Sequence, residues 1–241
     1  MQSRDRFSDI YMPTPATEDY LKAIYKLQEN AVAASTNAIA DRMGVSAASV
    51  TNMMKRLSES GLVEHRPYQA IRLTDAGRKI ALEIIRHHRL LEVYMAEALG
   101  FTWDQVDAEA ERLEHVISEE FEDKIDAMLG HPTTDPHGSP IPAKDLSIAS
   151  ANHDRLSDME PGRTVIVRRV KDTDPALLRY LAKLGLRPEN VVEVLSKEPF
   201  DGPMFLRVGG EEHHVGHQVA RSVLVECVPD EETKNDGRAG S

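Results

Sequence analysis

Two short helical segments separated by one glycine turn constrain the fold of this sequence more than any other feature. Ser35 is placed to cap a helix that ends before Gly44, and Ser46 is placed to cap a second helix over 47–59, which Gly61 stops. A serine at a helix start accepts hydrogen bonds from free backbone N–H groups, and glycine tolerates the left-handed backbone that ends a helix. Two helices joined in this way predict a helix-turn-helix, a motif that reads DNA.

A β-hairpin is expected directly after this motif. The segments LVEHR and AIRLT have strand character, with a turn at Pro67–Gln69 between them. Upstream, residues 17–29 carry apolar side chains at helical spacing behind Thr17, which we expect to be the N-cap. The sequence therefore predicts a winged helix-turn-helix over residues 1–73.

The second helix of the motif has one small and polar face. Small side chains let a helix approach the major groove, Asn pairs with adenine, and Lys and Arg bind phosphates. A solvated helix surface would look similar, but the hairpin that follows favours DNA. The expected DNA-contacting residues are Ser46, Ala48, Ser49, Thr51, Asn52, Lys55, Arg56 and Arg66.

Charge is distributed unevenly along the chain, whose formal net charge is −11. Residues 1–73 hold nine Lys and Arg against eight Asp and Glu, residues 74–147 hold seven against 16, and residues 148–241 hold 13 against 16. So acidic a chain would not coat nucleic acid by bulk attraction, and DNA binding is expected to depend on the N-terminal part alone.

Two long amphipathic helices are expected after the hairpin, over 74–99 and 102–129, the second capped by Thr102. Both helices carry more apolar residues than a single helix needs in order to pack on a protein core. This surplus suits a helix–helix dimer interface, although the core of a single subunit would explain it equally. Four prolines and a glycine in 131–145 predict an irregular linker.

Beyond the linker the pattern changes from helical to β. RTVIVRRV, NVVEVLSK, MFLRVGG and SVLVECV are predicted strands, and the one helix among them, 175–184, indicates a small antiparallel barrel with a single helical insertion. The fold class is therefore mainly α with a small β domain. The expected domains are the winged helix-turn-helix at 1–73, a helical dimerisation and metal-binding domain with its Pro-rich linker at 74–148, the barrel at 149–228 and a disordered tail at 229–241.

Carboxylates and imidazoles recur at helical spacing in the acidic segment. Three of them stand at i, i+3 and i+4 of the expected second long helix and so share one face. A histidine of the preceding helix would join them if the two helices pack antiparallel, and an acid near the start of the first helix could add another carboxylate. The resulting set is Asp19, His88, Glu111, Glu114 and His115. Without a thiolate, it suits Mn²⁺ or Fe²⁺ better than a structural Zn²⁺.

Other interpretations of this set stay open. A glutamate on an acidic helix is most often solvated, and a histidine on an apolar face is most often hydrogen-bonded in the core. A metal-dependent hydrolase or oxidase would also use carboxylates and histidines, but no Ser–His or Cys–His pattern or glycine-rich phosphate loop accompanies them. We therefore expect no enzyme; a metal-independent DNA-binding scaffold is the third interpretation.

The order of these parts resembles the diphtheria-toxin-repressor family of metal-dependent transcriptional regulators, over about residues 14–228. The motifs that carry the resemblance are ATEDYLKAIYKL, GVSAASVTNMMKRLSESGLV, LTDAGRKIA, HHRLLE, EAERLEHVISEE and DPHGSPIP, and the C-terminal part is similar to a FeoA-type, Src-homology-three-like barrel. The resemblance implies a homodimer that binds Mn²⁺ or Fe²⁺ and then double-stranded operator DNA of metal-uptake genes, usually as a repressor. It also implies that the five residues form the activating metal site.

Two carboxylates indicate the branch of the family. Iron-responsive members have Met at the position of Asp19 and Cys at that of Glu111, whereas manganese-responsive members have carboxylates there. Oxygen donors favour Mn²⁺ relative to Fe²⁺, so Mn²⁺ is the expected cofactor and Fe²⁺ the alternative. The chain departs from the manganese branch at Lys22, where a glutamate can stand, so that ligand is missing.

The resemblance also implies a second site, and so two ions per subunit. Three-domain manganese members bring a Cys-Pro-His-Gly loop to a glutamate at the position of Glu92, and here the loop reads Asp-Pro-His-Gly. We predict a second site of Glu92, Asp135 and His137. The candidates for a further ligand from the barrel are Asp172, Asp174 and the 211–214 run.

The expected location of the chain is the cytoplasm. Its one cysteine, Cys227, cannot form an internal disulfide, which points to a reducing compartment. No apolar run approaches the length of a membrane helix, and the first residues lack the apolar core of a signal peptide. Neither a membrane nor a small organic substrate is expected as a partner.

Overall fold

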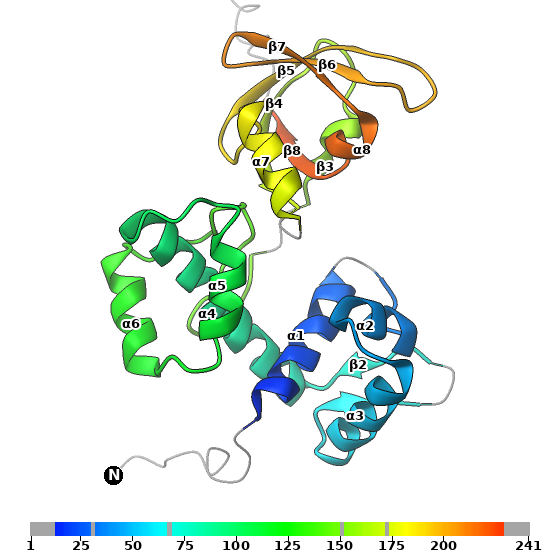
Figure 1. The fold of residues 1–241 in the computed structure, drawn as a ribbon, viewed down its shortest axis with the longest axis vertical. Helices are drawn as coiled ribbons and strands as arrows, with labels where there is room; N and C mark the ends of the chain where they lie inside the picture. The colour runs from blue at the N-terminus through cyan, green and yellow to red at the C-terminus, as the bar shows by residue number, and fades with distance from the viewer. Residues whose placement is uncertain (1–12, 30–31, 67–68, 150–151, 172–173, 229–241) are drawn as a thin grey trace, which may run out of the picture. The chain divides into compact units, whose positions relative to one another are not determined.

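The computed structural model describes residues 13–29, 32–66, 69–149, 152–171 and 174–228. They belong to two compact units (Figure 1). The first unit comprises residues 1–91, 110–131 and 141–148, and the second comprises 92–109, 132–140 and 149–241. The predictions for positions 67 and 68 of the hairpin turn and for the tail at 229–241 lie outside the described residues.

The first unit begins with the predicted winged helix-turn-helix. Its elements are α1 (Pro15–Glu29), α2 (Thr36–Met43), α3 (Ala47–Glu59) and the antiparallel pair β1 (Val63–Glu64) and β2 (Arg72–Leu73). Ser35 Oγ accepts from Ala38 N at 3.1 Å, and Ser46 Oγ accepts from Ser49 N at 3.1 Å. Gly44 ends α2 with φ at 66°. The expected caps and the helix-turn-helix are therefore confirmed.

The start of α1 differs from the prediction. The helix begins at Pro15, so Thr17 lies inside its first turn and is buried, whereas Thr14 Oγ1 accepts from Thr17 N at 3.3 Å. Proline suits the first helical position because it lacks a backbone N–H, and an N–H at this position would have no partner within the helix. The prediction that Thr17 is the N-cap is wrong, and Thr14 takes that place.

Apolar side chains of α1, α2, α3 and the hairpin share one core. Leu21 and Ile24 of α1, together with Met54 and Leu57 of α3, are almost completely buried in it. Because α3 turns its apolar face inward, its small and polar residues stay on the outer surface.

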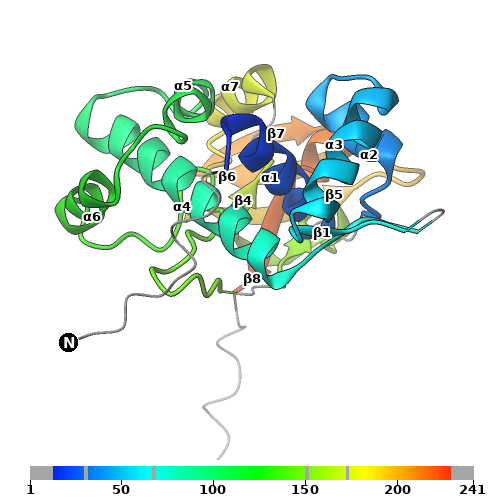
Figure 2. The ribbon, with the colours of Figure 1, turned by 90° about the horizontal axis from the view of Figure 1, so that it is seen from below.

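The long-helix prediction is half right. Helix α4 runs unbroken over Asp75–Ala98, as Figure 2 shows, but the expected helix over 102–129 is two helices, α5 (Val106–Leu113) and α6 (Glu119–Met128). Ser118 Oγ accepts from Phe121 N at 3.3 Å and starts α6 afresh, and three glutamates in the first turn suit the positive helix N-terminus. The prediction that Thr102 caps this helix is wrong, because α5 starts only at Val106, and Thr102 N donates to Gln105 Oε1 in the turn before it.

The second unit contains the predicted small barrel. Its six strands form one antiparallel sheet in the order β3-β8-β4-β5-β6-β7, and the helix α7 (Pro175–Lys183) follows β4. Alternate strand residues and two leucines of α7, Leu178 and Leu181, fill one core. The strands are β3 (Asp154–Arg155), β4 (Thr164–Val170), β5 (Val191–Lys197), β6 (Met204–Val208), β7 (Glu211–Val215) and β8 (Val223–Cys227).

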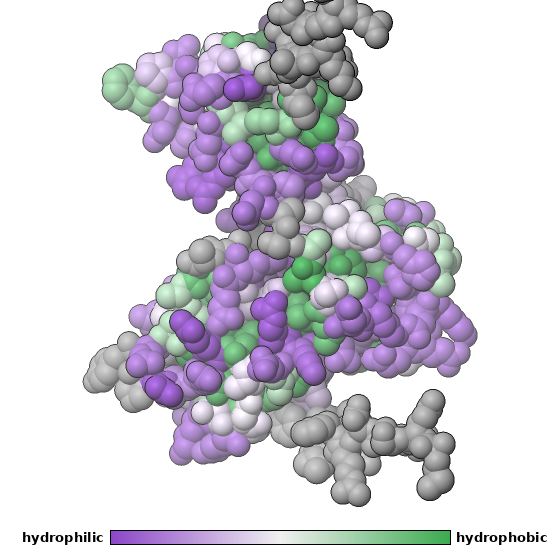
Figure 3. All heavy atoms as spheres, turned by 180° about the vertical axis from the view of Figure 1, so that it is seen from behind, coloured by the Kyte–Doolittle hydropathy of each residue, from purple (hydrophilic) through white to green (hydrophobic). Residues whose placement is uncertain are grey.

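The barrel has more elements than the sequence predicted. Strands β3 and β7 were missed, and the helical insertion is not single because a short helix, α8 (His217–Ala220), precedes β8. Strand β7 lacks apolar alternation, since Val215 is its only buried residue. Phe200, in the loop between β5 and β6, is fully exposed. Figure 3 shows that hydrophobic and hydrophilic residues are mixed over one face of the molecule.

The Pro-rich segment is irregular, as expected, with one isolated bridge between Thr134 and Pro140. It is fixed against β4, because Val170 N donates to His137 O at 2.9 Å. Gly138 has φ at 87°, and a Cβ there would lie 1.9 Å from Arg168 O, so only glycine fits this approach. Among the described residues, no helix is both long and apolar enough to cross a membrane.

Candidate metal centre

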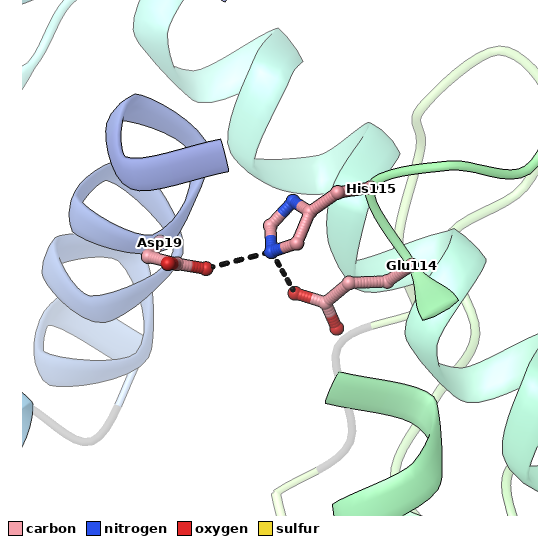
Figure 4. A group of neighbouring side chains, drawn as sticks. All are labelled: Asp19, Glu114 and His115. Atoms are coloured by element: carbon pink, nitrogen blue, oxygen red, sulfur yellow. Dashed lines mark ion pairs between the residues drawn. The ribbon is translucent and has the colours of Figure 1, made fainter. Parts of the chain in front are cut away.

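Helix α1 and the turn after α5 meet at a group of carboxylates around one histidine. His115 Nε2 lies 2.9 Å from Asp19 Oδ1 and 3.6 Å from Glu114 Oε1. Figure 4 shows the ring of His115 with one nitrogen directed at both carboxylates. The other ring nitrogen, Nδ1, lies 2.6 Å from Glu18 Oε2. Glu18 therefore orients the imidazole so that Nε2 faces Asp19 and Glu114, which is the arrangement typical of a metal-binding histidine.

The break between α5 and α6 alters the geometry expected for this set. Glu111 lies in α5, but Glu114 and His115 lie in the turn that follows Leu113, so the three do not share one face of a long helix. Glu114 N still donates to Ala110 O at 2.9 Å and closes the last helical turn. The chain then bends, which carries His115 toward α1.

A second group of potential ligands overlaps the first. His88 Nδ1, on α4, lies 2.5 Å from Glu114 Oε2 and 3.7 Å from Glu111 Oε2. Glu114 is fully buried and belongs to both groups. The structure thus brings all five residues of the predicted activating site together around Glu114.

Lys22 of α1 enters the same cluster. Its Nζ lies 2.6 Å from Glu111 Oε2, 2.6 and 2.8 Å from the two oxygens of Glu114, and 3.5 Å from His88 Nδ1. Only 5% of Lys22 is exposed. Lys22 was expected only as a missing ligand, although its spacing of three residues from Asp19 puts both side chains on one face of a helix.

The pKa values of the cluster follow from burial and from this ion pairing. Burial alone would raise the pKa of Glu114, but hydrogen bonding to His88 and the charge of Lys22 outweigh it and lower the pKa below its ordinary value. Burial would lower the pKa of Lys22, but Glu114 and Glu111 raise it. The pKa of Asp19 is raised, first by burial and then by the nearby negative charges of Glu111 and Glu114, against the opposing effect of His115.

The donor set fits a hard divalent cation. Ligand atoms of Asp19, Glu114 and His115 lie within 4.8 Å of one another, and they offer oxygen and imidazole nitrogen without sulfur. The ammonium group of Lys22 already lies against two of the carboxylates, so the site accommodates positive charge.

A second buried group lies in the other unit. Glu92, Asp135 and His137 are each at most 5% exposed, and their ligand atoms lie within 4.8 Å of one another. Asp135 Oδ1 accepts from His137 N at 2.8 Å and from Ser139 N at 2.9 Å, which holds the loop in shape.

The hydrogen bonds of His137 decide which nitrogen could bind a metal. Its Nε2 lies 2.7 Å from the carbonyl oxygen of Trp103, which can only accept, so Nε2 carries the proton. In the neutral form of the ring the lone pair is then on Nδ1, which lies 3.5 Å from Glu92 Oε1. A neutral imidazole with an oriented lone pair is the form in which histidine binds metals.

Three of the suggested barrel ligands interact with other residues of the barrel. Asp174 caps α7, because its Oδ1 accepts from Ala176 N at 2.8 Å. On β7, Glu212 pairs with Arg207 and His214 packs on the ring of Phe205. Asp172 lies outside the described residues.

The proposed DNA-contacting residues all lie on the surface of the first unit. Ser46, Ala48, Ser49, Thr51, Asn52, Lys55, Arg56 and Arg66 are exposed. Some are partly engaged locally, since Ser46 Oγ lies 2.9 Å from Ser49 Oγ and Thr51 Oγ1 donates to Ala47 O. Asn52 and the basic residues remain available to an approaching duplex.

Comparison with known proteins gives three matches along the chain. Residues 12–71 match the iron dependent repressor N-terminal DNA binding domain, residues 74–143 match the iron dependent repressor metal binding and dimerisation domain, and residues 155–227 match the FeoA domain. A winged helix joined to a carboxylate–histidine centre defines the class as metal-dependent DNA-binding transcriptional regulators. The chain belongs to the iron-dependent repressor family, a family of transcriptional repressors and not of enzymes.

Individual relatives cover nearly the whole chain. The iron-dependent repressor IdeR of Mycobacterium leprae is 34% identical over 224 residues, which is 88% of this chain and 97% of that protein. A solved manganese-dependent transcriptional repressor in complex with manganese is 38% identical, with a TM-score of 0.82 over 88% of this chain and 100% of the other. The apo form of the manganese-activated repressor ScaR is 34% identical, with a TM-score of 0.74 over 87% and 100%.

Proposed function

We propose that this protein is a Mn²⁺-activated homodimeric repressor that binds operator DNA of metal-uptake or metal-homeostasis genes in the cytoplasm. Residues 1–73 would bind DNA, residues 74–148 would dimerise and bind metal, and residues 149–228 would form the FeoA-like barrel. The contact between Asp19 of α1 and His115 after α5, at 2.9 Å, carries this proposal. One cation held there joins the DNA-binding part to the dimerisation part.

The residues of the cluster indicate how metal would control DNA binding. A divalent cation at the site supplies positive charge that several carboxylates share. Asp19 is the ligand on α1, so its attraction to the cation fixes the position of the winged helix relative to the turn after α5. To change the ratio of DNA-binding to inactive protein by about 100-fold, the metal must bind the DNA-binding state more tightly by about 2.7 kcal/mol. Two or three added ligand contacts can supply this difference.

Two sites and two ions per subunit are part of this proposal. The activating site would use Asp19, His88, Glu111, Glu114 and His115, and the second site would use Glu92, Asp135 and His137. The second site lies in a buried loop that Gly138 and the backbone hydrogen bonds of Asp135 hold in place.

Exposed apolar side chains support the homodimer. On the segment that contains α5 and α6, Leu113, Val116, Phe121 and Met128 are 40%, 73%, 43% and 59% exposed. Apolar groups gathered on one segment mark protein interfaces more often than isolated ones do. A second copy of this chain is the proposed partner, and sedimentation in solution measures it.

The test of the proposal is binding of selected DNA duplexes at controlled metal concentrations. Duplexes are selected from a random library in the presence of Mn²⁺ and then titrated by fluorescence anisotropy in buffered Mn²⁺ or with chelator. We expect tight binding with Mn²⁺ and a loss of about 100-fold with chelator. Equal binding in both conditions would contradict the proposal and support a metal-independent DNA-binding protein.

A regulator activated by Fe²⁺ is the second candidate, because the curated relative from Mycobacterium leprae is an iron-dependent repressor. The same titration under anaerobic conditions with buffered Fe²⁺ separates the two. The carboxylates at Asp19 and Glu111 favour Mn²⁺. Restoration of DNA binding by Fe²⁺ and not by Mn²⁺, each buffered at its physiological free concentration, would favour the second candidate.

A further inference from the structure

We infer that two side chains of the second unit, Arg187 and Trp103, position His137 for the proposed second metal site. The inference rests on the proposed function, because it concerns how one proposed ligand of that site is held. A guanidinium group and an indole N–H are hydrogen-bond donors with no lone pair for a cation. Both side chains therefore act through the imidazole and are positioning residues.

Trp103 contacts His137 in two ways. Its carbonyl oxygen lies 2.7 Å from His137 Nε2, and the indole and imidazole rings stack with their centroids 5.8 Å apart and their planes at 27°. The hydrogen bond alone would let the imidazole turn about the direction of its N–H group. The stacked indole restricts that rotation, so Nδ1 stays directed toward Glu92 Oε1, 3.5 Å away.

The barrel in turn holds Trp103. This residue lies in the loop before α5, but it is only 6% exposed and belongs to the hydrophobic core of the barrel. The guanidinium carbon of Arg187, in the turn after α7, lies 4.8 Å from the centroid of the indole. Among aromatic rings the indole attracts a cation most strongly, and a planar guanidinium stacks on it. Beside this contact, Arg179 of α7 pairs with Asp104 at 3.0 Å, so two arginines hold neighbouring residues of one loop.

The turn that carries Arg187 has a fixed backbone. Gly185 O accepts from Arg187 N at 3.0 Å and from Asn190 Nδ2 at 2.7 Å, and Leu186 between them is completely buried. The side chain of Arg187 thus starts from a rigid point, while the residue itself is exposed. Its replacement should therefore change the contact with Trp103 and leave the core of the barrel intact.

The indole N–H supports the same assignment. Trp103 Nε1 is buried and has no hydrogen-bond partner among the described residues. An unpaired buried N–H is unfavourable, and a phenyl ring would fill the core without it. What the indole adds over a phenyl ring is the larger surface for Arg187 and His137.

The test uses the full chain, because Trp103 is its single tryptophan and therefore the source of its tryptophan fluorescence. Mn²⁺ is paramagnetic and quenches an indole close to it, so fluorescence during a Mn²⁺ titration reports binding next to Trp103. The variant His137→Asn shows which part of the quenching belongs to the proposed second site. Mass spectrometry counts the ions bound at saturation.

Three variants of Arg187 and one matched control are compared. Arg187→Ala should weaken the His137-dependent Mn²⁺ affinity by about 10-fold, with the same number of ions at saturation. Arg187→Gln serves as a second uncharged variant if Arg187→Ala does not fold. Arg187→Lys keeps a cation over the ring and should lose only about 3-fold. Arg207→Ala breaks two exposed ion pairs of the same barrel and should bind as the parent does.

The outcomes separate this inference from the proposed function. Equal Mn²⁺ affinity in the parent and Arg187→Ala would overturn the inference. An equal loss in Arg207→Ala would also overturn it, because general stability of the barrel would then explain the effect. A parent without His137-dependent quenching would refute the proposed second site and the inference with it. A loss confined to the Arg187 variants, together with DNA binding that ignores Mn²⁺, would support the inference and overturn the proposed activation.

Discussion

His115 Nδ1 lies 2.6 Å from Glu18 Oε2, while Nε2 of the same ring contacts Asp19 and Glu114. Glu18 contacts no part of the proposed metal position directly and acts through the orientation of the imidazole. Glu18→Ala should therefore weaken Mn²⁺ binding by about 10- to 100-fold without changing the number of ions bound at saturation. Isothermal titration calorimetry measures both quantities. Glu18→Gln keeps an accepting oxygen and should recover most of the affinity; equal affinity in parent and Glu18→Ala would contradict the assigned role.

Asp19 is the proposed metal ligand on α1, which packs in the core of the winged helix-turn-helix, so its removal should weaken the dependence of DNA binding on Mn²⁺. Asp19→Asn should lose about 100-fold of its Mn²⁺-dependent affinity for the selected duplex, measured by anisotropy, and should still fold. Glu160→Gln, an exposed change in the other unit, is the control and should behave as the parent. Binding by Asp19→Asn without Mn²⁺ as tight as that of the parent with Mn²⁺ would disprove the linkage.

Gly138 offers a test of the proposed second site that leaves its three proposed ligands unchanged. Gly138→Ala places a Cβ 1.9 Å from Arg168 O, so the loop must move away from β4 and the protein should retain one Mn²⁺ fewer per chain. Gly210 has φ at 88°, close to the 87° of Gly138, but a Cβ there meets nothing within 4 Å. Gly210→Ala therefore controls for backbone strain and should keep the full metal count. If both variants lose metal equally, strain alone explains the result.

Glu122 of α6 forms a buried network with Arg86 and His87, at 2.5 and 3.1 Å. Burial raises the pKa of Glu122, but hydrogen bonds from His87 and Arg86 outweigh it and hold the pKa at about 2, against 4.5 ordinarily. Because the folded pKa is lowered, this stabilisation is complete above pH 4.5 and is lost as the pH falls toward 2.

Glu122→Gln should therefore lower the free energy of unfolding by about 3 kcal/mol at pH 6 and flatten its decline between pH 4.5 and 2. Urea unfolding in chelator measures this. Glu120→Gln on the same helix breaks only the exposed pair with Lys124 and should change stability by less than about 0.5 kcal/mol. A parallel pH decline in parent and Glu122→Gln would show that other groups cause it.

The exposed face of α3 predicts two kinds of DNA variant. Asn52→Ala should cost about 1 to 3 kcal/mol on the selected duplex and little on unrelated DNA, because amide pairing with a base is sequence-specific. Lys55→Ala should weaken both duplexes alike and reduce the slope of affinity against salt by about one. Salt titrations of both variants on both duplexes measure this, and a uniform loss for Asn52→Ala would remove it from base recognition.

The sequence alone determined the parts whose causes are local. Ser35, Gly44 and Ser46 place the ends of α2 and α3 because capping acts within a few residues, and the types of the charged residues already indicated a site of oxygen and nitrogen donors. Local signals gave a wrong prediction at 102–129. The helical spacing of apolar residues continues across the break between α5 and α6, but Ser118 caps a new helix there.

Tertiary structure decided what lies next to what. The sequence places Lys22 on the same helix face as Asp19 and gives no role to Glu18, and only the packing of α1 against the α5–α6 turn places the two side chains against Glu114 and His115. Gly138 needs to be glycine only because β4 passes within reach of it. These relationships join residues far apart along the chain, so no periodicity or spacing encodes them. Which cation neutralises the acidic cluster is therefore a property of the folded protein.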